Sequence, residues 1–155
     1  MKLVERLRST AILVVVAYLA LRVIITLASP HPLLVDMPEA CEPSSQNCAR
    51  LDLDGGHRMD GVSPLVVSYG AEAEFWEAVE AWAAEEPRTS LLHEEANFRH
   101  YAVQTEFWGF VDDVTVSIDQ QSGEVVLQSQ SRIGLSDLGV NPERLTSMAA
   151  ALTPQ

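Results

Sequence analysis

Residues 110–133 read FVDDVTVSIDQQSGEVVLQSQSRI, with apolar and polar residues alternating on both sides of a Ser-Gly pair at 122–123. A period of two predicts two antiparallel β-strands, at about 110–118 and 124–133, joined by a tight turn. A correct register must place the apolar residues of both strands on one side of the sheet. The register that does so pairs Ile118 with Val125, Val116 with Leu127, Val114 with Ser129, Asp112 with Ser131 and Phe110 with Ile133.

The segment before this hairpin extends the sheet, because a period of two also runs through residues 89–93 and 98–107. Four strands joined in order by short turns form an antiparallel meander. If Trp108 and Gly109 make a two-residue turn, Thr105 faces Asp112, and Asp112 lies on the inner face between Thr105 and Ser131. A carboxylate on a core face is costly unless it is hydrogen-bonded, and two hydroxyl groups are suitable donors. The sequence therefore predicts a polar cluster at this point.

A second polar cluster is predicted on the outer face of the same strands. The register places Arg132 diagonal to Asp113 and level with Glu106, within reach of a salt bridge. The candidate site has five members in all, which are Asp112, Asp113, Ser131, Arg132 and Asp137. They either stabilise the sheet or line a pocket beside the closing helix, where a carboxylate does acid–base work or binds a ligand. We favour the structural interpretation, because no nucleophile and base occur in a recognisable arrangement.

Two helices are predicted beside the sheet. In residues 71–86 an apolar stripe that includes Trp82 recurs at helical spacing, and Pro87 ends the pattern. This is typical of an amphipathic helix whose tryptophans pack in the core. A closing helix is expected after Asn141 as its cap, with Pro142 at the first helical position. One antiparallel sheet with helices packed on one face is an α+β fold, and we assign it to residues 65–155 as a single domain.

An apolar run occupies residues 11–28, after a charged lead of residues 1–10, and only Arg22 interrupts it. Eighteen residues at about 1.5 Å each span roughly 27 Å, close to the hydrocarbon thickness of a bilayer. The run predicts one N-terminal transmembrane helix. Arg22 lies near enough to its far end for the guanidinium to reach the interface, or else it contacts a partner helix or a lipid headgroup.

The charges around this helix predict its orientation. Lys2, Arg6 and Arg8 precede it, and the first charges after it are acidic, so the N-terminus is expected in the cytoplasm and the domain outside the inner membrane. A cleaved signal peptide is the alternative, although Arg22 interrupts what would be its apolar region. Residues 1–28 sum to +3, and subtracting this from the net charge of −12 leaves −15 for the rest of the chain. Such a domain repels nucleic acid and anionic lipid headgroups.

Residues 29–64 are rich in proline and lack periodicity, so we expect a tether between membrane and domain. The spacing of Cys41 and Cys48 favours a disulfide outside the cytoplasm over a metal site. His93 and His100 are able to approach each other across a strand pair, but two imidazoles without a third ligand do not predict zinc. We therefore expect no metal and no cofactor.

Two motifs carry a resemblance to a known family. Residues 107–114, FWGFVDDV, and residues 129–141, SQSRIGLSDLGVN, resemble the signature of the domain-of-unknown-function family 1499, as does the pair Cys41 and Cys48. The resemblance covers about residues 41–152. Gln46, Gln128 and the pair at 142–143 depart from the family's proline, arginine and basic residues. The resemblance implies an extracytoplasmic domain, found in bacteria and associated with the thylakoid lumen in plants, and it implies no established activity.

The leading hypothesis is a non-catalytic interaction module. We expect an accessory subunit of a membrane complex, with a respiratory or photosynthetic assembly implied by the family's associations. Its partners would be that complex or a cationic extracytoplasmic protein, together with the bilayer around residues 11–28. The alternative is a small-molecule or lipid-binding domain, with or without enzymatic activity, whose polar site surrounds Asp112, Ser131, Arg132 and Asp137. The two hypotheses differ in what they require, because a binder needs a concave, mostly apolar cavity with Asp112 or Arg132 at its wall.

Overall fold

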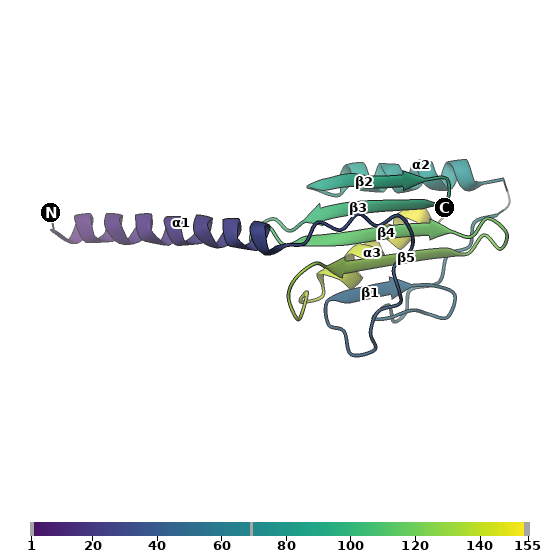
Figure 1. The fold of residues 1–155 in the computed structure, drawn as a ribbon, viewed down its shortest axis with the longest axis horizontal. Coiled ribbons are helices and arrows are strands. Elements are labelled where there is room, and N and C mark those ends of the chain that lie inside the picture. The colour runs from purple at the N-terminus through teal and green to yellow at the C-terminus, as the bar shows by residue number, and fades with distance from the viewer. Residues whose placement is uncertain (1, 69, 154–155) are drawn as a thin grey trace.

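A long helix projects from a single sheet that carries two shorter helices on one face (Figure 1). The structure is a computed structural model, and it describes residues 2–68 and 70–153. Its helices are α1 Lys2–Ala28, α2 Glu72–Glu85 and α3 Val140–Leu152, and its strands are β1 Cys48–Leu51, β2 Thr89–Glu95, β3 Phe98–Gln104, β4 Val111–Ile118 and β5 Val125–Ser131. The five strands lie antiparallel in the order β1-β5-β4-β3-β2. The predicted α+β class is confirmed.

The predicted pairing of β4 with β5 is confirmed from Asp112 opposite Ser131 to Ile118 opposite Val125. The predicted pairing of β3 with β4 is wrong by two residues, because Asp112 lies opposite Val103 and not opposite Thr105. The reason is a longer connection, in which the Thr105 amide donates to the Phe110 carbonyl at 2.8 Å. A shift of two keeps every side chain on its face but removes Thr105 from the inner cluster. Glu106 likewise lies outside the paired strands.

The core lies between the sheet and the two helices. Val79, Trp82 and Phe75 of α2 are buried against the inner sheet face, as the helical spacing predicts. The Arg99 guanidinium lies 4.4 Å from the centre of the Trp76 ring, so this buried strand arginine packs as a cation on an aromatic face. The tryptophans of α2 are therefore core residues.

The closing helix begins two residues earlier than predicted, at Val140 and not at Pro142. Gly139 is its N-cap with φ +92°, and Asn141 lies inside the first turn. The prediction of Asn141 as a cap was wrong because this side chain turns into the core and is fully buried. Its amide bonds to groups on β5, which a solvent-facing cap position could not reach.

Part of the segment expected to be a tether belongs to the folded domain. Residues 48–51 form β1, which pairs with β5 along the whole of its length. Residues 30–40, which we call the strap, pass over the outer face of the sheet (Figure 1). The disulfide between Cys41 and Cys48 joins the end of the strap to β1. Outer-face residues such as Thr115 and Gln128 are consequently buried beneath it.

Helix α1 is apolar along residues 4–28, with a mean hydropathy of 2.6 in its most apolar window. It is long enough to cross a bilayer, and most of its side chains are exposed in the isolated chain. Its length and composition fit a membrane anchor or a signal sequence.

Candidate functional site

The inner cluster joins β4 and β5 to α3. The Asp112 carboxylate lies 3.0 Å from Nη2 of Arg144, and both side chains are almost fully buried. Ser131, the predicted partner, also donates a hydrogen bond to Asp112. Thus one of the two expected hydroxyl groups is present, and a guanidinium takes the place of the other.

Asn141 extends this cluster to the edge of the sheet. Its amide nitrogen donates to the Asn47 carbonyl at 3.0 Å and to the Ser131 hydroxyl at 3.1 Å. Its amide oxygen accepts from Ser129 at 2.6 Å and from Arg144 at 2.9 Å. Since the amide has two donors and one acceptor oxygen, all of its hydrogen-bonding capacity is used within the protein. An amide bonded to β5, to Arg144 and to the residue before β1 stabilises the packing of α3 on the sheet.

Burial raises the pKa of Asp112 above its usual value, and this effect outweighs the opposing charge of Arg144 and the hydrogen bond from Ser131. Folding therefore favours the protonated carboxyl group. The contribution of Asp112 to the free energy of unfolding therefore decreases as the pH rises from its unfolded-state pKa through its folded-state pKa. A general acid also needs a raised carboxyl pKa, so the pKa of Asp112 does not distinguish a structural role from a catalytic one, and the neighbours of the carboxyl group must do so.

Asp137 is held by an arginine that the sequence analysis did not single out. Arg58 donates to the two Asp137 oxygens at 2.9 and 2.8 Å, a bidentate pair, and the Gly139 amide donates to Asp137 at 2.9 Å. Burial alone would raise the pKa of Asp137, but these hydrogen bonds and the Arg58 charge lower it below the usual value. The carboxylate thus stays ionised and joins the connection between β1 and α2, which contains Arg58, to the segment just before α3.

The outer cluster is centred on Asp113. Nε of Arg132 donates to its two oxygens at 3.1 and 3.0 Å, and Nη2 donates at 2.8 Å. His100, whose side chain is fully buried, lies on the other side with Nε2 at 2.7 Å from the carboxylate. Burial alone would raise the pKa of Asp113, yet the hydrogen bonds from His100 and Arg132 and the charge of Arg132 lower it. The predicted pair of Asp113 and Arg132 is present.

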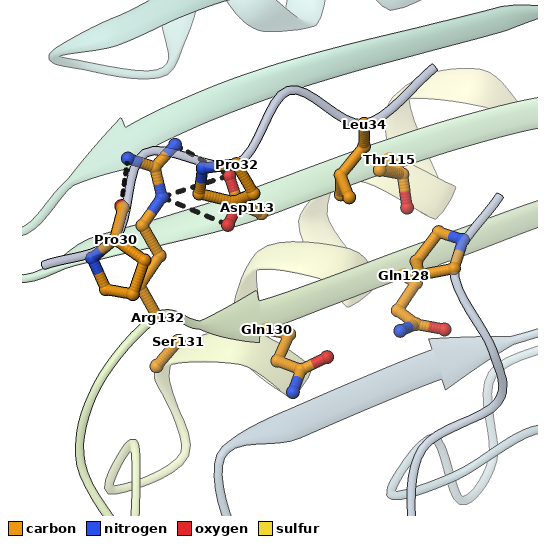
Figure 2. A pocket seen from close by; sticks show the side chains of 10 residues that line it. Pro30, Pro32, Leu34, Asp113, Thr115, Gln128, Gln130, Ser131 and Arg132 are labelled. Atoms are coloured by element: carbon orange, nitrogen blue, oxygen red, sulfur yellow. Dashed lines mark hydrogen bonds and ion pairs between the residues drawn. The ribbon is translucent and has the colours of Figure 1, made fainter. Parts of the chain in front are cut away.

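The outer cluster also attaches the strap. The Leu34 amide donates to Nδ1 of His100 at 3.2 Å, which leaves the proton on Nε2 to be donated to Asp113. Arg132 donates to the Pro30 carbonyl at 3.0 Å and approaches Nδ1 of His31 at 3.3 Å. Figure 2 shows the Arg132 guanidinium between the Asp113 carboxylate and the strap. A tether would not be attached in this way.

Two small cavities adjoin these clusters. The outer cavity, about 220 Å³, lies between the strap and the outer sheet face, with Arg132 and Asp113 in its wall (Figure 2). The inner cavity, about 210 Å³, lies where the β3–β4 and β5–α3 connections meet. Its lining is mostly apolar, including Trp108 and Ile133, with Asp112 and Asp137 at the polar side. Both volumes are below the roughly 300–1,000 Å³ of typical ligand sites.

The predicted site residues divide into two groups on opposite faces of the sheet. Asp112, Ser131 and Asp137 line the inner cavity, whereas Asp113 and Arg132 line the outer one, with Ser131 touching both. The predicted closeness of Glu106 to Arg132 fails because β3 ends at Gln104. His93 is paired with His100 along the strands, but within the described ranges no group of three or more ligating side chains could hold a metal ion. Any catalytic or binding role for these residues stays a prediction.

Sequence reasoning missed the partners that determine the clusters. Arg144, Arg58 and the strap contacts come from segments remote from β4 and β5 in the chain. A usable signal existed, since the acidic domain contains few arginines and its carboxylates on a core face require cations. Arg22 lies against Gly109 of its own chain, and its expected position at the membrane interface or contact with a partner helix or lipid headgroup stays a prediction.

Residues 40–152 match the family model described as protein of unknown function (DUF1499), and the chain belongs to this family. The match confirms the resemblance seen in the two motifs, and it extends over β1 and the disulfide loop. No curated protein and no solved structure matches the chain.

Proposed function

We propose that this member of the DUF1499 family is a single-pass inner-membrane protein whose domain lies outside the cytoplasm and serves as a non-catalytic accessory subunit of a membrane complex. The basic lead before α1 and the acidic chain after it support this orientation. The disulfide supports an oxidising compartment.

The main support for a non-catalytic role is that each of the three carboxylates of the candidate site is paired with an arginine. Each has an arginine partner at 3.0 Å or less: Asp112 with Arg144, Asp113 with Arg132 and Asp137 with Arg58. A carboxylate held in this way does not serve as a free acid or base, and the Ser131 hydroxyl beside Asp112 donates to a carboxylate that is already paired with Arg144. These residues are therefore used to hold the fold together.

The surface of the domain supports a cationic partner. Helix α2 turns Glu74, Glu77, Glu80 and Glu85 to solvent, and the neighbouring β2 exposes Glu94 and Glu95. A cluster of like charges, in a segment (residues 29–155) whose net charge is −15, attracts a basic protein surface and accelerates its association at low salt. We call this surface the acidic face.

Gentle detergent extraction of the tagged full-length chain tests the proposal. We expect a stoichiometric membrane complex, such as a respiratory or photosynthetic assembly, to co-purify at low salt. The double variant Glu77→Lys and Glu80→Lys should lose this complex, whereas the charge-matched control Asp54→Lys and Asp60→Lys should retain it. A chain that emerges alone from the membrane, or equal behaviour of both variants, would contradict the proposal.

A second candidate function rests on the inner cavity, which is apolar and has Asp112 at its wall. It suits the end of an acyl chain or a small apolar molecule better than a large ligand, because its volume is only about 210 Å³. If Asp112→Asn retained the melting temperature of the protein but lost a co-purifying lipid, this second function would replace the first.

A further inference from the structure

One face of α1 is covered by the domain. Among residues 4–28, all side chains are exposed except those of Tyr18, Arg22 and Ile25. Their spacing of four and three residues places them on a single stripe of the helix. A stripe of this kind marks a packed interface, and here it lies within the apolar segment that is long enough to span a bilayer.

The partner of this stripe is the β3–β4 connection. The Tyr18 hydroxyl donates to the Phe107 carbonyl at 2.6 Å, and the Tyr18 ring lies 5.2 Å from the Phe107 ring and 6.0 Å from the Trp108 ring. Arg22 lies beside Gly109, where a Cβ atom would be 2.8 Å from its Nη2. The tip of this connection is thus attached to the membrane helix itself.

The contact lies deep in the helix. Tyr18 precedes Ala28, the last residue of α1, by ten positions, which corresponds to about 15 Å along the helix axis. Hydrocarbon offers no partner to a polar group, so a backbone carbonyl at this depth must be satisfied by the protein. The Tyr18 hydroxyl and the Phe107 carbonyl satisfy each other. Around this bond the side chains are aromatic, and Phe107 and Trp108 remain 61% and 42% exposed.

The connection between β5 and α3 also exposes large apolar side chains. Leu135 and Leu138, between β5 and α3, are 94% and 92% exposed, and Leu138 has φ +54°, a conformation that leucine rarely adopts. Both connections lie at the end of the sheet from which α1 projects (Figure 1). Trp108 and Leu138 line one cavity, so the two connections are neighbours. We call Phe107, Trp108, Leu135 and Leu138 the apolar rim.

We propose that the apolar rim inserts into the extracytoplasmic leaflet of the bilayer beside α1, so that the domain rests on the membrane with its strands upright. This inference rests on the proposed function in one respect, namely that α1 crosses the membrane. Lipid is the occupant we choose because the rim continues the apolar surface of α1, which is long enough to span a bilayer. The acidic domain gains no attraction to anionic headgroups through its charge, so a contact of the domain with the bilayer beside α1 should be apolar.

Quenching of tryptophan fluorescence by brominated acyl chains tests this inference. The full-length chain would be reconstituted, at a low ratio of protein to lipid, into phosphatidylcholine vesicles with or without bromine on the acyl chains. We expect the bromolipid to remove a part of the emission from the wild-type protein that is missing from Trp108→Phe. Trp76 and Trp82 contribute equally to both proteins, and their emission cancels in the difference.

Two reporters in the Trp108→Phe background distinguish the rim from the rest of the domain. Leu138→Trp should be quenched, because it places the indole in the second connection of the rim. Val66→Trp is the matched control, since Val66 is 61% exposed and pairs with Glu124 near the β4–β5 turn, at the opposite end of the sheet (Figure 1). Its emission should be unchanged by bromolipid.

The inference is overturned if Trp108 escapes quenching, whether a protein partner, a second copy or water covers the rim. It is also overturned if Val66→Trp is quenched as much as Trp108, because the domain would then lie on its side. Extraction of the vesicles at alkaline pH tests the transmembrane anchor separately. If the chain resists extraction while Trp108 stays unquenched, α1 is an anchor but the apolar rim does not insert into lipid. A chain released by alkali would contradict the anchor instead.

Discussion

Removal of the Asp113 carboxylate should strongly destabilise the domain and loosen the strap. In the structure the carboxylate receives three hydrogen bonds from Arg132 and one from His100. The Asp113→Ala variant would leave the Arg132 side chain, 4% exposed, as a buried cation bonded to the Pro30 carbonyl. Removing one partner of a buried ion pair costs about 3–5 kcal/mol. Because domains have about 5–15 kcal/mol of stability, this loss is a large fraction of the total.

The conservative variant separates charge from shape. Asp113→Asn retains one acceptor oxygen but presents an amide NH₂ group to donors, so we expect an intermediate loss of about 1–3 kcal/mol. Asp60→Ala is the matched control, since Asp60 is an exposed aspartate in a surface turn, and its effect should stay within about 0.5 kcal/mol.

Urea unfolding of the full-length chain in detergent micelles, followed by near-ultraviolet circular dichroism, measures these differences. Hydrogen exchange at the Leu34 amide gives a second readout, because this amide donates to His100, which Asp113 orients. We expect faster exchange in Asp113→Ala at concentrations of urea where the core remains folded. If the variant lost less than about 1 kcal/mol and Leu34 remained protected, the outer cluster would not hold the strap and our account of it would be wrong.

Three further predictions concern other parts of the domain. Reduction of the disulfide should lower the free energy of unfolding by about 2–3 kcal/mol, the value for a loop this short, and addition of reductant during the same urea titration measures it. Gly56→Ala should cost about 3 kcal/mol or more, because Gly56 has φ +74° and a Cβ atom there would lie 1.9 Å from the Arg50 carbonyl oxygen. Gly55→Ala is the control, since a Cβ atom at Gly55 would meet no atom within 4 Å and only backbone strain should result. Equal melting temperatures for the two variants would refute the clash. Because the pKa values of Asp113 and Asp137 are lowered by folding, both carboxylates stabilise the folded state above their unfolded pKa of about 3.9, and this stabilisation is progressively lost as the pH falls below it. In an acid titration the stability of the wild type should therefore fall more steeply than that of Asp113→Asn.

Local sequence pattern was sufficient for much of the sheet. The β4–β5 register followed from alternation alone, because the turn between these strands is short and a shift of one residue would turn every apolar side chain to the wrong face. The register of β3 could not be derived in this way. A shift of two residues keeps every side chain on its face, so the apolar pattern does not distinguish the two registers, and the length of the connection decided between them.

The candidate site was predicted in part for the same reason. Asp112 and Ser131 are strand neighbours, and alternation placed them together. The salt bridge of Asp113 with Arg132 also followed from the register. Arg144 is on α3, and its approach to Asp112 depends on the angle and rotation with which that helix packs on the sheet, which the periodicity of either segment does not determine.

Hydropathy, charge and periodicity are local properties of the chain, so they were enough to predict that a long apolar helix precedes one acidic α+β domain. The tertiary structure was needed to show that the expected tether contains a strap, which a disulfide and a fifth strand join to the sheet. It alone brought Tyr18 to Phe107, 89 positions away. Contacts over such separations depend on how whole elements pack, and a pattern read along the chain carries no information about that packing.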